Sequence, residues 1–96
     1  MKYIDNEKVI VDLGWDGLLI NSQDGAVSLT GKDGLIVYDG EKDEEGTNHV
    51  VKLGRFEDEE NKYSYGLRLY KKDDNNNYNE TLVTTNDGQL WLKDYI

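Results

Sequence analysis

The sequence predicts an all-β domain of short antiparallel strands joined by tight turns, and two observations support this fold class. The dipeptide Asp-Gly stands directly before a short apolar run at four places along the chain. Asp bonds back to its own backbone and Gly accepts positive φ, so the pair is favoured in tight turns. Apolar residues, by contrast, never recur at helical spacing over more than one turn. The copies are Asp16-Gly17, Asp24-Gly25, Asp33-Gly34 and Asp87-Gly88.

The first half of the chain predicts a series of short strands. Residues 9–13 form an apolar run that ends before the first Asp-Gly pair. The next strands follow the pairs that begin at Asp16, Asp24 and Asp33. This spacing leaves about five residues for each strand, which is close to the usual strand length. A polar loop over residues 40–47 then interrupts the series.

The second half predicts a strand over residues 49–55, an acidic loop over residues 57–62 and a strand over residues 63–70. The last of these has the clearest alternation of apolar and polar residues in the chain. Side chains two residues apart share a face of a strand, so we expect its apolar face to be buried. That face consists of Tyr63, Tyr65, Leu67 and Leu69.

The last predicted element is a hairpin. After a polar turn over residues 71–79, two apolar runs at 81–85 and 89–93 flank Asp87-Gly88. A hairpin turn between them would bring Leu82 or Val83 opposite two further leucines. These are Leu90 and Leu92.

Length and composition favour one small domain that is stabilised by association. The chain has 96 residues, of which 36% are apolar, so we interpret residues 1–96 as a single module with a modest core. It contains no Cys and one His, and therefore lacks the disulfides or zinc cluster that stabilise many small folds. Burial against further copies of the chain is the remaining route to stability.

The charge of the chain is acidic and unevenly distributed. The net charge is −9, and acidic residues crowd the segment 39–60. A negative potential repels phosphate backbones, so we expect no nucleic-acid partner. Solvated loops that keep an assembly soluble explain the charge most simply. A small acidic inhibitor that imitates nucleic acid is the alternative.

One segment resembles a calcium-binding loop. Asp73, Asn75 and Asn77 have the spacing of EF-hand ligands. The EF-hand then requires a Gly where Tyr78 stands and a bidentate Glu where Thr84 stands. We therefore interpret the segment as a turn and expect neither a metal site nor a cofactor.

The sequence offers little for catalysis. Without Cys there is no thiol nucleophile, and the Ser residues lie in no nucleophile motif. His49 falls within an expected strand, where an imidazole is more often a surface residue than a general base. A chain with one small core also has little volume for a cleft. We expect no catalytic residues and no enzyme activity.

Aromatic side chains are the residues of the sequence that could bind a ligand. Rings of Trp and Tyr combine apolar area with a polar group and can stack on sugars, which makes a carbohydrate-binding module the first alternative. Packing in a core or a subunit interface is the simpler explanation, because several rings alternate with Leu. The candidates for sugar stacking are Trp15, Trp91 and Tyr70.

Several stretches together are similar to a module of phage and prophage tail proteins from Gram-positive hosts. The resemblance covers about residues 17–94 and lies in the runs KDGLIVYDG from Lys32, VVKLGR from Val50, YGLRLY from Tyr65 and ETLVTTNDGQLWLK from Glu80. The module occurs in minor structural proteins of tail fibres, tail tips and baseplates. Such fibres are homotrimers of β-structure, often intertwined, that connect the tail to receptor-binding parts.

The resemblance implies a non-enzymatic virion structural protein, made in the host bacterial cytoplasm and located in the virion tail. Its partners would be two further copies, neighbouring domains of the tail protein and, during host attachment, a cell-surface glycan, with no nucleic acid and no membrane insertion. The acidic stretches 41–46 and 57–61 are longer than in the module, and a fibre would continue beyond Ile96, so we expect a fragment of a longer protein. The expected trimer interface or core comprises Tyr63, Tyr65, Leu67, Leu69, Leu90 and Leu92.

Overall fold

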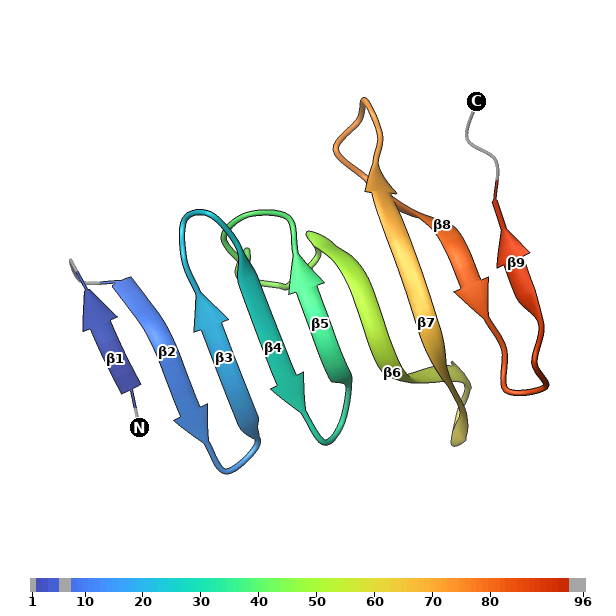
Figure 1. Cartoon of the computed structure of the whole chain (residues 1–96), viewed down its shortest axis with the longest axis horizontal. Helices are drawn as coiled ribbons and strands as arrows, with labels where there is room; N and C mark the ends of the chain where they lie inside the picture. Colours follow the sequence, from blue (N-terminus) through green and yellow to red (C-terminus); the bar gives the residue numbers. More distant parts are fainter. Residues whose placement is uncertain (1, 6–7, 94–96) are drawn as a thin grey trace.

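The structure, a computed structural model, describes residues 2–5 and 8–93 and folds them into one nine-stranded antiparallel sheet (Figure 1). The strands lie in the sheet in chain order, so each one pairs with the next. The predicted all-β class is confirmed, and no helix that could cross a membrane occurs in these two ranges. The strands are β1 (Lys2–Asp5), β2 (Lys8–Gly14), β3 (Gly17–Asn21), β4 (Ala26–Thr30), β5 (Gly34–Tyr38), β6 (His49–Glu59), β7 (Lys62–Lys72), β8 (Tyr78–Thr84) and β9 (Leu90–Leu92).

Glycines fix where the short strands begin. Gly17 opens β3 with a φ of 144°, and Gly34 opens β5 with a φ of 84°. A Cβ at Gly17 would lie 2.3 Å from the carbonyl oxygen of Leu29 on the next strand. Only glycine allows the backbones to approach this closely at positive φ. β3, β4 and β5 each have five residues, the length expected from the sequence.

The β6–β7 hairpin is longer than the sequence suggests. Both strands have 11 residues, so the expected acidic loop over residues 57–62 is wrong for most of its length. Backbone pairing continues to Glu59 opposite Lys62. Two cross-strand contacts favour the extension: Arg55 lies 4.2 Å from the ring of Tyr63, and Glu59 pairs with Lys62 at 3.2 Å.

Two further boundaries differ from the expectation. β1 was not predicted, because it has four residues and no flanking turn motif. The turn expected over residues 71–79 shrinks, since β7 continues to Lys72 and β8 begins at Tyr78. In both places polar residues take part in backbone pairing, which does not depend on apolar side chains.

The molecule is a single layer with very little interior. Its extents are 43 × 33 × 20 Å. A compact chain of this length would have a radius of gyration of about 12–13 Å, whereas the Cα value is 14.7 Å. Among the described residues, the buried apolar side chains are Ala26, Tyr38 and Phe56. One chain therefore does not bury most of its own apolar side chains.

Candidate assembly surface

Strand alternation gathers aliphatic side chains on one face of the sheet, which we call the aliphatic face. Cross-strand pairing places them in two parallel rows that run from β2 to β9. The first row is Val11, Ile20, Val27, Val37, Val51, Leu69, Leu82 and Leu92, each paired with the next. The second row is Leu13, Leu18, Leu29, Leu35, Leu53 and Leu67, continued through Thr84 to Leu90.

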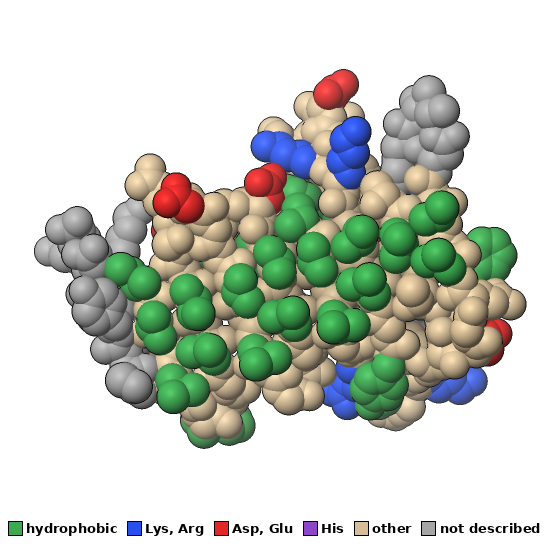
Figure 2. Space-filling model, viewed as in Figure 1, with side chains coloured by type: hydrophobic (Ala, Val, Ile, Leu, Met, Phe, Trp, Pro, Cys, Tyr) green, Lys and Arg blue, Asp and Glu red, His purple; other side chains and the backbone are tan. Residues whose placement is uncertain are grey.

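The aliphatic face is open to solvent in the single chain. Figure 2 shows hydrophobic side chains crossing the molecule from one side to the other, with charged side chains confined to its margins. Leu29 is 54% exposed and Leu53 is 51% exposed, although both lie on central strands. Contiguous apolar surface of this kind on a folded chain marks an interaction site.

The structure brings all six residues of the expected interface or core to this face. Leu67, Leu69, Leu90 and Leu92 belong to the two rows. Tyr65 and Tyr63 extend the face along β7, opposite Arg55 and Glu57 of β6. The expectation that this face is buried is wrong for the single chain, because Tyr65 is 60% exposed. No second layer of the chain covers it in the described ranges.

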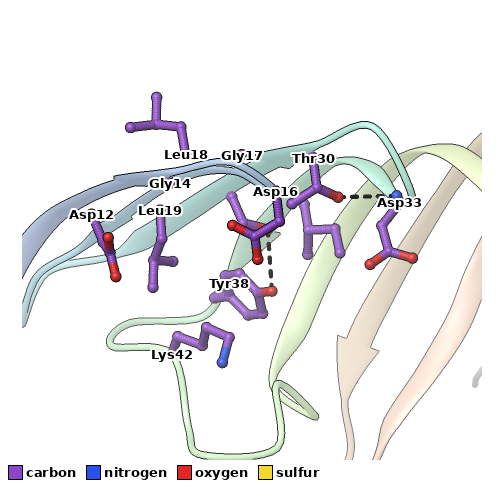
Figure 3. Close-up of a pocket in the computed structure, with 12 residues that line it drawn as sticks. Asp12, Gly14, Asp16, Gly17, Leu18, Leu19, Thr30, Asp33, Tyr38 and Lys42 are labelled. Atoms are coloured by element: carbon purple, nitrogen blue, oxygen red, sulfur yellow. Dashed lines mark hydrogen bonds between the residues drawn. The ribbon is translucent and has the colours of Figure 1, made fainter. Parts of the chain in front are cut away.

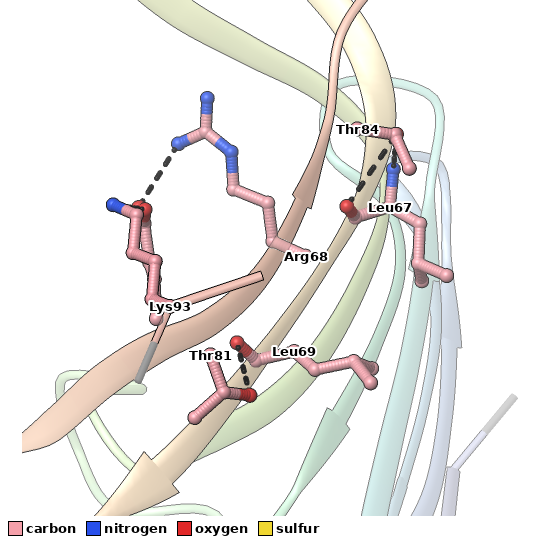
Figure 4. A network of polar contacts seen from close by, with 7 residues as sticks. Leu67, Arg68, Leu69, Thr81, Thr84 and Lys93 are labelled. Carbon is pink, nitrogen blue, oxygen red and sulfur yellow. Dashed lines mark hydrogen bonds and ion pairs between the residues drawn. The ribbon is translucent and has the colours of Figure 1, made fainter. Parts of the chain in front are cut away.

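The C-terminal hairpin forms as expected, and Leu82 rather than Val83 lies on the aliphatic face. Leu82 pairs with Leu92, while Val83 pairs with Trp91 on the opposite side of the sheet. The Thr84 hydroxyl accepts a hydrogen bond from the Leu67 amide at 2.8 Å and thereby fills its place in the second row (Figure 4). These links join the hairpin to the rest of the sheet.

An ion-pair network on the other side supports the same strands. Glu80 of β8 pairs with Arg68 of β7 at 3.3 Å and with Lys93 at 2.9 Å (Figure 4). Arg68 also lies 3.8 Å from the ring of Phe56, and Lys52 lies 4.6 Å from the same ring. Lys52 and Arg68 thus lie against the ring of Phe56. On this side of the sheet, charged side chains cover the buried ring.

The three candidate stacking aromatics do not form one platform. Trp15 is 99% exposed in the β2–β3 turn, and Trp91 is 56% exposed on β9, at the far side of the sheet. Tyr70 is half-buried on β7, where its ring meets that of His49 edge to face at 4.4 Å. Burial raises the pKa of Tyr70, and Glu80 adds to the shift. The sequence-based platform for sugar stacking is therefore not assembled.

The face opposite the aliphatic face carries a structured loop. Residues 39–48 fold back around Asn48, whose side chain donates to the carbonyl oxygens of Asp39 and Glu41 and accepts from the Asp43 amide. Asp43 in turn accepts two hydrogen bonds from Thr47, which lower the pKa of its carboxyl. This segment is an ordered cover over Tyr38 and not only a solvated loop.

The segment that resembles a calcium loop is closed by its own hydrogen bonds. The Asp73 carboxylate accepts from the amides of Asn75 and Asn77 at 2.8 and 2.9 Å and from the side chain of Asn79 at 2.8 Å. These bonds lower the pKa of Asp73, and the amide of Asn77 makes the largest contribution to the shift. In the part of the chain that the structure describes, no three His, Cys, Asp or Glu side chains are grouped as metal ligands.

Comparisons with known proteins identify no relative of this chain. No protein-family model, no curated protein and no solved structure matches the chain. The aliphatic face is therefore the feature from which a function is best argued.

Proposed function

We propose that this chain is a non-enzymatic structural module of a phage or prophage tail-fibre or tail-tip protein, which assembles as a homotrimer through its aliphatic face. The single observation that carries the assembly is the uncovered double row of Val, Ile and Leu side chains. The resemblance of the four sequence stretches supports the tail assignment, with the module connecting the tail to receptor-binding parts of the virion.

The size of the aliphatic face fits an interface between copies. Strands lie about 4.8 Å apart, so rows that cross from β2 to β9 extend roughly 34 Å, and two rows cover on the order of 500 Å². Contact with other copies would bury total surface on the order of 1,000 Å² or more, the range of specific interfaces. Each half-exposed aliphatic side chain contributes about 1 kcal/mol when it is covered.

The strand length fits three copies around an axis that runs across the strands. A five-residue strand spans about 17 Å, and the centre of a triangle with sides of that length lies roughly 5 Å from each side. This distance is half of the ~10 Å that separates packed sheets. Two inward side chains per strand from each copy would then fill the interior, and the rows would continue along the axis.

Two alternatives have weaker support. A carbohydrate-binding module based on Trp15, Trp91 and Tyr70 would need these rings in one place, and they are dispersed. An acidic inhibitor rests on charge alone, and part of that charge lies in the paired strands of the β6–β7 hairpin. Neither alternative accounts for the aliphatic face.

A charged side chain in the rows tests the assembly. Leu67→Asp would place three unpaired carboxylates in the trimer interface, which should cost several kcal/mol per assembly and separate the chains. Ser64→Asp is the matched control, because Ser64 lies on the same strand and its side chain points to the other face. Analytical ultracentrifugation should show a trimer for Ser64→Asp and monomers or unfolded chains for Leu67→Asp. Equal masses for the two variants would refute the proposed interface.

The tail assignment has its own test. Antiserum raised against the purified module should label the tails of phage particles released from the bacterium that carries the gene, when they are viewed by electron microscopy. Particles without label, in a preparation where a capsid antiserum does label, would contradict the assignment and leave the self-assembly untouched.

A further inference from the structure

A hollow on the face opposite the aliphatic face has the chemistry of a small-ligand site. Its volume is about 280 Å³, and it lies between the loop 39–48 and the turns at the other end of the strands. Figure 3 shows the Leu18 side chain on one side of the ribbon and the side chains of Leu19, Tyr38 and Lys42 on the other. The hollow therefore lies on the side of the sheet opposite the aliphatic face, and Leu18 is the residue of that face that also borders it. Glycines at positions 14 and 17 leave the hollow without side chains at one edge.

The floor of the hollow contains a hydroxyl pair that is only partly satisfied. Ser28 and Tyr38 are 8% and 6% exposed, both line the hollow, and their hydroxyl oxygens lie 3.3 Å apart. Two hydroxyls carry two hydrogens, and their mutual bond uses one. The other hydrogen has no acceptor among the described residues, although a buried donor normally has one. An oxygen atom of a ligand in the hollow would accept it.

The walls offer acceptor groups to a ligand that donates hydrogen bonds. Asp12, Asp16 and Asp33 line the hollow, and ionised carboxylates only accept. Lys42 is the one basic residue among the lining residues, so an anionic ligand is disfavoured. Leu19 and Ile36 provide an apolar floor for C–H groups.

We infer that this hollow binds one ring of a neutral saccharide. Sugar hydroxyls can donate to the carboxylates and accept from the hydroxyl pair, and the C–H face of a pyranose matches the floor of Leu19 and Ile36. The volume lies just below the range for drug-sized ligands, which suits a single ring. The site faces away from the proposed trimer interface and binds whether or not the chains associate.

An adjoining hollow gives room for a second sugar ring. It has a volume of about 370 Å³ and shares Asp33, Ile36, Tyr38 and Lys42 with the first. Lys52, which pairs with Asp33 at 3.7 Å, and Tyr70 line it as well. The Lys52 ammonium can donate to one sugar hydroxyl while the Asp33 carboxylate accepts from the adjacent one. The preferred ligand is therefore a disaccharide unit or longer.

Titrations with three sugars and one anion followed by amide chemical shifts test the inference. The probes are methyl β-D-glucopyranoside, methyl α-D-galactopyranoside, N-acetyl-D-glucosamine and glycerol 3-phosphate. At least one sugar should bind with a dissociation constant in the millimolar range, as expected for a ligand of this size, and shift the amides of Leu19, Ser28 and Ile36. No sugar binding up to about 50 mM, or tighter binding of glycerol 3-phosphate, overturns the inference.

Paired variants locate the site. Tyr38→Phe removes the buried hydroxyl and should weaken sugar binding about fivefold or more, the effect of one hydrogen bond. Its control is Tyr78→Phe, since the Tyr78 hydroxyl donates to Asp39 outside the hollow. Asp33→Asn should also weaken binding, whereas Asp87→Asn in the exposed β8–β9 turn should not. Unchanged binding in both Tyr38→Phe and Asp33→Asn would contradict the assigned site, even if the chain is a trimer.

Discussion

At the scale of single residues, Asn48 shows how a polar side chain organises a segment that looks unstructured in the sequence. Its amide group satisfies three backbone groups of the loop 39–48, and the residue is 9% exposed. Composition alone suggested a solvated acidic loop. The contacts that order the loop are hydrogen bonds between backbone groups and the side chain of one Asn, and composition does not reveal them. Sequence patterns report apolar spacing and cannot report such hydrogen bonds.

Asn48→Ala should destabilise the protein by about 2 kcal/mol, because buried backbone groups lose their partners. Urea unfolding at one fixed protein concentration measures the change. Asn75→Ala, in the exposed β7–β8 turn, is the control and should change the free energy of unfolding by less than about 0.5 kcal/mol. If Asn48→Ala changed the free energy of unfolding as little as Asn75→Ala does, the hydrogen bonds of Asn48 would contribute no stability.

Asp73 should make the protein sensitive to acid. Its folded-state pKa is lowered from the ordinary 3.8 by the amide of Asn77, the side chain of Asn79 and the amide of Asn75. A lowered folded pKa stabilises the fold above pH 3.8, and this contribution is lost as the pH falls through the folded value. Melts between pH 6 and pH 2 should therefore show a shallower decline for Asp73→Asn than for the unchanged chain. A decline in Asp73→Asn as steep as that of the unchanged chain would contradict this assignment.

At the scale of elements, the hairpins depend on glycines where two strands approach closely. Gly34 has a φ of 84°, and a Cβ there would lie 2.3 Å from the carbonyl oxygen of Leu53. Gly54 on the neighbouring strand is equally confined, with Asp33 O 2.2 Å from a Cβ. The Asp-Gly motif was visible in the sequence, whereas the close approach to Gly54 depends on pairing between β5 and β6.

Gly34→Ala should cost at least about 2 kcal/mol, because it adds both positive-φ strain and a backbone clash. Gly31→Ala is the matched control in the same β4–β5 turn, since a Cβ there meets nothing within 4 Å. Its free energy of unfolding should stay within about 0.5 kcal/mol of the unchanged chain. Chemical unfolding of both variants checks this, and equal free energies of unfolding for the two would contradict the specific requirement for glycine at position 34.

The sequence predicted strand positions better than strand ends. The five-residue strands followed from the spacing of Asp16, Asp24 and Asp33. The extension of β6 to Glu59 could not be predicted in this way. Charged residues form backbone hydrogen bonds across a hairpin as readily as apolar residues do, so the apolar pattern does not mark where the strand ends. The alternation in β7 correctly identified one face, but it could not show that no other layer of the described chain covers this face.

At the scale of the whole molecule, the central feature is a sheet with two different faces and almost no interior. The aliphatic face follows from register, which aligns one Val, Ile or Leu after another across β2 to β9. The sequence suggested only the β7 part of this face and the last hairpin, since strand pairing is needed to align the rest. The opposite face holds the ordered loop and the proposed sugar site.

The number of chains in solution is the sharpest test of assembly through the aliphatic face. Sedimentation equilibrium of the unchanged chain, combined with thermal melts over a hundredfold concentration range, measures the mass and the coupling of folding to association. A trimer formed through the aliphatic face predicts the mass of three 11.0 kDa chains and an unfolding midpoint that rises with concentration, because dilution favours separated chains. A folded monomer with a midpoint independent of concentration would contradict it.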